Sequence, residues 1–160
     1  MPTTFLATSF YWENLIFFGM GPQRGEDGKL AITLPMGDKK LPAIDVEDIG
    51  KCAYGVFKRG AELIGKTVGI AGEHLTGAEM AASLSKALGE EVGYNAVSPE
   101  AYRGFGFPGA EDLGNMFQFK RDFEASYCAS RDLAVSRSLN PELKTFDAWL
   151  AENGSRIPLG

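Results

Sequence analysis

The polarity of the chain alternates between short apolar runs and longer amphipathic runs. Four of the short runs are rich in β-branched and apolar residues and are bounded by Gly, Pro and polar residues, which is typical of strands. The pattern predicts strands at Thr3–Ser9, Leu30–Leu34, Lys66–Ala71 and Glu91–Val97. Helical segments alternate with these strands, so the sequence predicts an α/β fold in which helices pack on a small mixed sheet.

Capping residues mark where the expected helices begin and end. Asp45 is suited to be the N-cap of a helix that ends near Gly60, and Thr76 begins a capping box before a helix that Gly89 ends. Ser98 precedes a proline at the first helical position, which favours a further helix there. Three other helices are expected, at Phe10–Phe18, Ala110–Cys128 and Phe146–Glu152.

Composition and charge restrict the class of protein. The 160 residues, 44% apolar and 23% charged, fit one soluble domain. A net charge of −5 argues against a nucleic-acid partner, which needs a basic face. No run approaches the roughly 18 apolar residues of a membrane span, so we expect a cytoplasmic protein with no membrane partner. Cys52 and Cys128 are far apart, and two reduced thiols are favoured over a disulfide.

Two local motifs point to chemistry that their context does not favour. Residues 104–109, GFGFPG, match the glycine spacing of a dinucleotide loop, but they follow a helical segment and Pro108 lacks an amide hydrogen, so a turn between helices is favoured. His74 is the only histidine, and in a polar loop it is expected to be solvated or to cap a helix. Neither a zinc site nor a Ser-His-Asp triad is therefore indicated.

The aromatic and aliphatic run Phe10–Gly19 carries Glu13 and Asn14 in its middle. Burying an unpaired carboxylate costs several kcal/mol, about 2–7 for a neutral polar group and more for a charge. These two residues are therefore either turned to solvent or held for a purpose. A helix whose polar side faces water is one interpretation, and a ligand pocket with placed polar groups is the other.

Four ordered blocks resemble the carboxyl-terminal half of the NmrA-like family, atypical members of the short-chain dehydrogenase superfamily. They are residues 3–15, 41–57, 65–94 and 106–119, and the resemblance extends over nearly the whole chain. It implies a Rossmann-type relationship and a single carboxyl-terminal domain spanning 1–160. We expect the amino-terminal dinucleotide-binding half, with its glycine-rich strand-turn-helix, to be absent.

The resemblance also implies a site. The family places the equivalents of Tyr11, Trp12, Glu13 and Asn14 just past the end of a strand, against the nicotinamide side of NADP or NAD. On this basis these four residues are the expected cofactor-binding residues, and Phe10, Tyr11 and Trp12 would form an apolar wall. No catalytic residue is assigned, because the family's catalytic segment lies upstream, and no metal-binding residue is assigned, because the chain has no second histidine and no CxxC motif.

Two other blocks have both a structural and a functional interpretation. Asp45 and Asp48 are favoured as helix caps over ligand contacts. In the helix expected at 110–128, a stripe of apolar side chains is expected to face the core, whereas Phe119 lies off that stripe and hints at a surface for a partner. The stripe consists of Leu113, Met116, Phe117, Phe123 and Tyr127.

Three hypotheses of function follow. The leading one is a non-enzymatic, redox-sensing regulator module that recognises a small ligand near Trp12 or a protein partner. The alternatives are a fragment of a NAD(P)H-dependent quinone or isoflavone-type reductase, and a truncated, self-associating structural product. We expect this chain alone to bind NADP or NAD weakly or not at all. Because Thr3–Ser9 would present an open strand edge, we also expect a homodimer.

Overall fold

The computed structural model describes residues 1–160 and has the α/β architecture that the sequence predicts. All four expected strands form, but they belong to two different sheets. β1 (Phe5–Ala7) pairs in parallel with β6 (Thr67–Gly69), and β4 (Leu30–Leu34) pairs in parallel with β8 (Val92–Ala96). The single small sheet of the prediction is therefore replaced by several small sheets.

A third sheet lies between these two pairs and contains strands that the sequence pattern did not indicate. β5 (Lys40–Ile44) is its central strand, parallel to β2 (Phe10–Tyr11) and antiparallel to β7 (Glu73–Thr76). β3 (Gln23–Arg24) adds a short antiparallel edge to β4. β2 has only two residues, and β5 contains a proline, so neither carries the alternating pattern by which strands are found.

Three helices begin at the caps that the sequence predicts, and a fourth begins after Thr145. Side chains of Asp45, Thr76, Ser98 and Thr145 each accept a hydrogen bond from a backbone amide in the first turn of the helix that follows, and Thr76 completes a capping box with Glu79. These helices are α2 (Val46–Arg59), α3 (Gly77–Leu88), α4 (Pro99–Arg103) and α8 (Phe146–Asn153). Local sequence therefore fixes where they start.

Two expectations about helices are wrong, and one helix was not expected. The helix expected at Phe10–Phe18 is reduced to α1 (Asn14–Phe17), because Phe10 and Tyr11 pair with β5 instead. The long helix expected at Ala110–Cys128 is interrupted at Phe123, which separates α5 (Ala110–Asp122) from α6 (Glu124–Ala129). α7 (Leu133–Leu139) was not predicted. Two 3₁₀ turns, Gly60–Leu63 and Gly154–Arg156, follow α2 and α8.

The buried face of α5 also differs from the expected stripe. Ala110, Gly114, Phe117 and Lys120 are its buried residues, while Phe123 is 56% exposed. Phe119 is 55% exposed, as expected for a residue off the stripe. A lysine thus takes a place in the buried face that the pattern assigned to apolar side chains.

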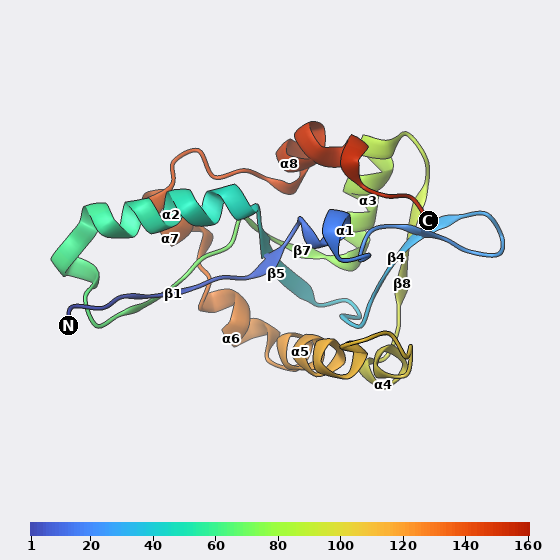
Figure 1. Ribbon diagram of the computed structural model, residues 1–160, viewed down its shortest axis with the longest axis horizontal. Coiled ribbons are helices and arrows are strands. Elements are labelled where there is room, and N and C mark those ends of the chain that lie inside the picture. Colours follow the sequence, from blue (N-terminus) through green and yellow to red (C-terminus); the bar gives the residue numbers. More distant parts are fainter.

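The helices cover the strands from two sides (Figure 1). α3 and α8 lie together on one side of the strands, whereas α4, α5 and α6 form a layer on the other, and α2 and α7 cover the end where the chain begins. The buried apolar side chains form a large cluster of 19 residues, which includes Trp12, Phe117 and Trp149, and a small cluster of seven residues around Cys52 and Ile70. None of the helices is both long and apolar enough to cross a membrane.

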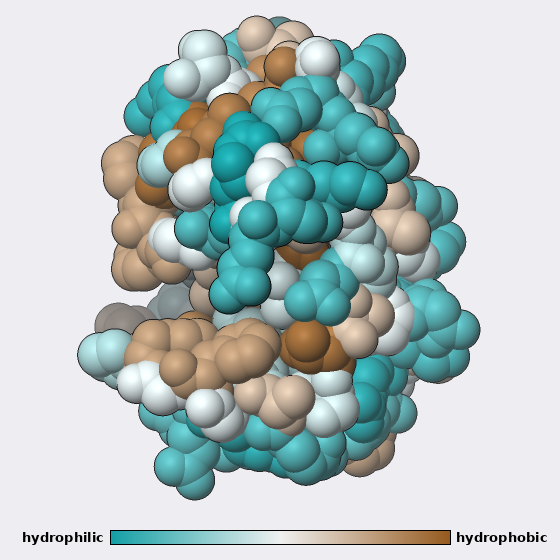
Figure 2. Space-filling model, turned by 90° about the vertical axis from the view of Figure 1, so that its right-hand side faces the viewer, coloured by the Kyte–Doolittle hydropathy of each residue, from teal (hydrophilic) through white to brown (hydrophobic).

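The end of the molecule that carries β3, β4 and β8 is mainly hydrophilic, with hydrophobic side chains gathered in separate patches (Figure 2). One apolar hollow, of about 480 Å³, is lined by aromatic residues that include Phe18, Phe105 and Phe107. The GFGFPG segment lies beside it as the turn between α4 and α5, as the sequence predicts.

Candidate functional site

A pocket of about 470 Å³ lies where the end of β2 meets the N-terminus of α2 and the last helix. Tyr11, Glu13 and Asn14 line it, from the segment in which the sequence placed the site. The opposite wall comes from distant parts of the chain: Asp45, Val46, Glu47, Lys144, Glu152, Asn153 and Arg156, with Phe17 and Phe18 at the rim. Three of the four predicted residues are therefore brought to one pocket.

The carboxylate of Glu13 is fixed by hydrogen bonds from two distant parts of the chain. Its Oε1 accepts a hydrogen bond from Trp149 Nε1 at 2.9 Å, and its Oε2 accepts one from the backbone amide of Val46 at 3.2 Å. Val46 is the first residue of α2, where the partial positive charge of the helix favours a carboxylate. Glu13 thus joins α1, α2 and α8, which is the purpose that its place in an apolar segment required.

Lys144 forms ion pairs with the other three carboxylates of the pocket. Its Nζ lies 2.7 Å from Glu152 Oε2, 2.9 Å from Asp45 Oδ2 and 3.7 Å from Glu47 Oε2. Asp45 also caps α2, because its Oδ1 accepts from the amide of Glu47 at 3.0 Å. No feature of the sequence singled out Lys144, which lies in a loop about 100 residues beyond Asp45 and meets it only in the folded chain.

The protonation of the pocket follows from these contacts. Burial raises the pKa of Glu13, and the neighbouring Asp45 carboxyl adds to the rise. Burial acts in the same direction on Asp45, but hydrogen bonds with Lys144 and Glu13 outweigh it and hold the pKa of Asp45 below its usual value. The hydrogen bond to Glu152, aided by Asp45, raises the pKa of Lys144. The lysine therefore stays charged and paired.

Trp12 does not line the pocket. Its side chain is fully buried, and its ring centroid lies 5.4 Å from that of Phe146 and 6.1 Å from that of Trp149. Phe10 is also buried, 6.0 Å from Phe117. The expected apolar wall is thus part of the large cluster behind the site, because alternate residues along β2 face opposite ways and Tyr11 alone is exposed.

Asn14 and Tyr11 also line the pocket, and unlike Glu13 their side chains do not bind a backbone amide. Asn14 is half-buried, and its amide makes no hydrogen bond within the chain. The hydroxyl of Tyr11 makes one hydrogen bond, 3.0 Å long, with Thr8 Oγ1. Asn14 is therefore the residue whose donor and acceptor are both free for a ligand.

Asp48 is not a helix cap, contrary to expectation. It is fully buried, and its oxygens accept hydrogen bonds of 2.8 Å from Asn140 Nδ2 and from the backbone amide of Lys144. Glu73 accepts similarly from the amide of Phe146 at 2.6 Å. Carboxylates therefore fasten the segment 140–146, which connects α7 with α8 beside the pocket.

The lone histidine and the two cysteines have structural surroundings. His74 lies in β7 rather than in a loop, and its Nε2 is 2.9 Å from the carbonyl oxygen of Arg131, while burial lowers its pKa. Cys52 and Cys128 are free thiols. Burial raises the pKa of Cys52 to about 11, which leaves its thiol protonated.

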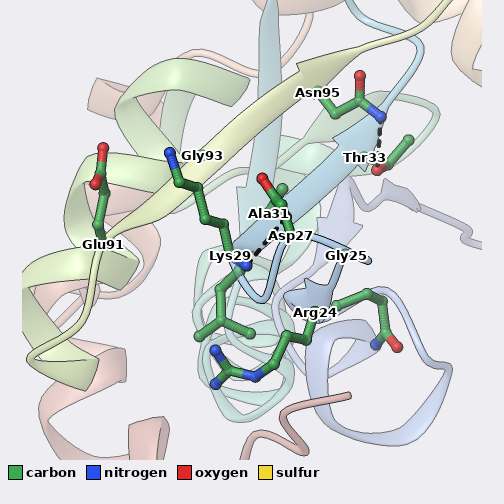
Figure 3. Close-up of a pocket in the computed structure, with 11 residues that line it drawn as sticks. Arg24, Gly25, Asp27, Lys29, Ala31, Thr33, Glu91, Gly93 and Asn95 are labelled. Atoms are coloured by element: carbon green, nitrogen blue, oxygen red, sulfur yellow. Dashed lines mark hydrogen bonds between the residues drawn. The ribbon is translucent and has the colours of Figure 1, made fainter.

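A second hollow, of about 380 Å³, lies over β3, β4 and β8 (Figure 3). Small side chains such as Ala31 and Gly93 leave the space open. Some of its polar groups are engaged with neighbours: Arg24 pairs with Glu90 at 2.7 Å, and Asn95 donates to Thr33 Oγ1 at 3.4 Å. This hollow is the solvated outer face of a sheet, and it holds none of the residues that the sequence singled out.

Residues 1–150 match the model of the NmrA-like family, so the chain belongs to that family. The match confirms the family that the four sequence blocks indicated, and the assignment to its carboxyl-terminal half stays a prediction.

Two relatives of the chain are a differentiation protein and a reductase. The chain is 26% identical over 157 residues to prestalk A differentiation protein A of Dictyostelium discoideum, which covers 94% of this chain and 50% of that protein. It is 33% identical over 115 residues to the NAD(P)H azoreductase of Xenophilus azovorans, which covers 68% of this chain and 38% of that protein. The chain thus spans half or less of the length of these relatives.

Solved structures share the fold. The triphenylmethane reductase of a Citrobacter species, complexed with NADP(H), has a TM-score of 0.73 at 22% identity, over 96% of this chain and 53% of the reductase. NmrA, a negative transcriptional regulator in complex with NAD, has a TM-score of 0.70 at 20% identity, over 95% of this chain and 52% of the regulator. The neighbours therefore include a regulator and a reductase, both bound to nicotinamide dinucleotides.

Proposed function

We propose that the chain is a non-enzymatic binding module of the redox-sensing NmrA-like type, which recognises a small ligand at the pocket of Tyr11, Glu13 and Asn14. The observation that carries this proposal is that Glu13 and Lys144, the charged groups at the centre of the pocket, already bind other groups of the chain. Glu13 is bonded to Trp149 and Val46, and Lys144 is surrounded by carboxylates. Both side chains are therefore engaged with partners within the chain, whereas the side-chain amide of Asn14 is free to make hydrogen bonds.

The ligand that fits such a pocket is neutral and planar at the end it presents, such as the carboxamide of a nicotinamide ring. Asn14 offers one donor group and one acceptor, which match an amide, and the exposed ring of Tyr11 lies beside it. Affinity for a whole dinucleotide is expected to be weak. The pyrophosphate normally rests on a glycine-rich helix N-terminus after a strand, and residues 1–160 contain no such segment.

Calorimetric titration with NADPH, NADP, NADH and NAD tests the proposal. We expect a Kd of about 1 mM or weaker, worth roughly 4 kcal/mol of binding free energy, with no turnover of quinone or dye acceptors. Asn14→Ala should weaken this binding at least fivefold, and Asn95→Ala, in the hollow over β8, should leave it unchanged. Micromolar affinity that survives Asn14→Ala would contradict the assignment.

A reductase is the second candidate. The identity of 33% with an NAD(P)H azoreductase favours it, and so does a buried amine, Lys120, that has no carboxylate partner. Oxidation of NADPH by this chain with an azo dye or quinone, followed at 340 nm, would support the reductase over the binding module.

Partners form the third part of the proposal. β1 pairs with β6 alone, so its other edge is open for a second copy of the chain, and the adjoining hollow of about 340 Å³ is lined by apolar residues that include Leu6, Phe57 and Ile64. A homodimer closes this edge. Phe119 and Phe123, 5.0 Å apart and exposed, offer a separate aromatic surface to a protein partner. Sedimentation as a monomer at about 100 µM would exclude the homodimer.

A further inference from the structure

Lys120 is a buried lysine without an anionic partner. Its residue is 7% exposed, and it makes neither an ion pair nor a hydrogen bond. Lysines are almost never buried to this degree unless they are paired. Lys144 illustrates the usual arrangement, because two carboxylates lie within 3 Å of its Nζ. The position of Lys120 on the buried face of α5 therefore needs another explanation.

Aromatic rings replace the missing carboxylate. Nζ of Lys120 lies 5.6 Å from the ring centroid of Phe117, 5.7 Å from that of Tyr127 and 5.9 Å from that of Phe10. The three rings come from α5, α6 and β2, so the amine sits where these elements meet. Although Nζ has no hydrogen-bond partner, it is not completely buried, so a small part of it remains accessible to solvent.

A second cation is adjacent to the same ring. The guanidinium carbon of Arg131 lies 3.7 Å from the centroid of Tyr127, and Arg131 Nε donates to the carbonyl oxygen of Thr8 at 2.8 Å. Burial is the main cause that lowers the pKa of Lys120, to about 8, and the positive charge of Arg131 adds to it. Desolvation and a neighbouring cation are the two means by which proteins make a lysine nucleophilic near neutral pH.

We propose that Lys120 is a nucleophilic site that reacts with small aldehydes and ketones. The lone pair of the neutral Nζ attacks the carbonyl carbon and forms a carbon–nitrogen bond, while the carbonyl oxygen takes up the proton that the nitrogen loses. The resulting carbinolamine releases water and leaves an imine, so no oxidant or reductant is consumed. The site is separate from the pocket of Asn14 and does not depend on the proposed binding function.

Reductive trapping tests the site in the intact chain. The folded protein is treated with acetaldehyde and cyanoborohydride between pH 6.5 and 10, and the labelled lysines are identified by peptide mass mapping. At pH 7 an amine of pKa about 8 is neutral roughly 300 times more often than one at 10.5, and its lower intrinsic nucleophilicity takes back about tenfold or more. We expect Lys120 to be labelled at least tenfold faster than Lys58.

Lys58 is the matched comparison, because its Nζ also lies over a ring, 5.6 Å from the centroid of Tyr54, but on an exposed surface. The preference for Lys120 should disappear when the protein is unfolded in urea, since the desolvation disappears with the fold. Equal labelling of the two lysines in the folded chain would overturn the proposal, and so would a preference that persists in urea.

Discussion

The sharpest prediction concerns the stability lost by burying Lys120. Its pKa in the folded protein is about 8, against 10.5 as the ordinary value. Between these two values the unfolded chain binds more protons than the folded one, so stability rises with pH from about 8 to about 10.5. Below pH 8 Lys120 is charged in both states, so the folded protein carries the full free-energy cost of burying that charge. Lys120→Met removes the charge and keeps an unbranched side chain of similar length.

The magnitude follows from the shift. A difference of about 2.5 pKa units corresponds to roughly 3 kcal/mol at about 1.4 kcal/mol per unit. The variant should therefore be more stable than the wild type at pH 7, by up to about 3 kcal/mol, or a rise in Tm of roughly 6–12 °C. That advantage should shrink by a similar amount as the pH approaches 10.5. Urea unfolding followed by tryptophan fluorescence measures the difference in unfolding free energy at pH 7 and its decrease towards pH 10.5.

The comparison of the two proteins cancels other titrating groups, since the wild type and the variant share them. Lys58→Met serves as the control, because Lys58 is exposed and its replacement should give no advantage that depends on pH. If the stability difference between Lys120→Met and the wild type is the same at pH 7 and pH 10, the burial of a charged amine is not what limits stability here.

Three further predictions concern the pocket and its support. Trp12→Ala should cost about 3–5 kcal/mol in urea unfolding, because Trp12 is fully buried; a loss below 1 kcal/mol would show that it is not a core residue. Burial raises the folded pKa of Glu13, so the wild type should lose stability relative to Glu13→Gln as the pH rises from 4.5; parallel stability curves would contradict this. Asp48→Ala should cost roughly 3 kcal/mol or more, because it leaves the Asn140 amide and the Lys144 backbone donor without acceptors, and an unchanged urea midpoint would refute that role.

Local signals in the sequence predicted much of the fold. Asp45, Thr76 and Ser98 cap helices through hydrogen bonds to amides two or three residues away, and Gly89 adopts the left-handed conformation that ends α3. Such contacts involve only neighbouring residues, so the pattern that encodes them is visible in a short window.

The pocket required contacts that no short window contains. Tyr11, Glu13 and Asn14 were found through the family resemblance, but Trp12 was misplaced because the two-residue strand β2 exists only through its pairing with β5. Lys144 and Trp149 meet Glu13 or Asp45 across more than 90 residues of sequence. The family pattern therefore located one wall of the pocket, and tertiary packing supplied the other.

The division of the buried side chains into a cluster of 19 and a cluster of seven has a consequence for how the molecule opens. The small cluster supports β1, β6 and α7, and β1 and β6 form a sheet of only two strands. Two-stranded sheets are marginal without further packing. Amide hydrogen exchange should therefore be fast in β1 and β6 and slow in β4 and β8. The part of the molecule that carries the open strand edge is thus also the part expected to unfold first. A partner that covers this edge would stabilise it against unfolding, and the cost of ordering the edge would lower the observed affinity.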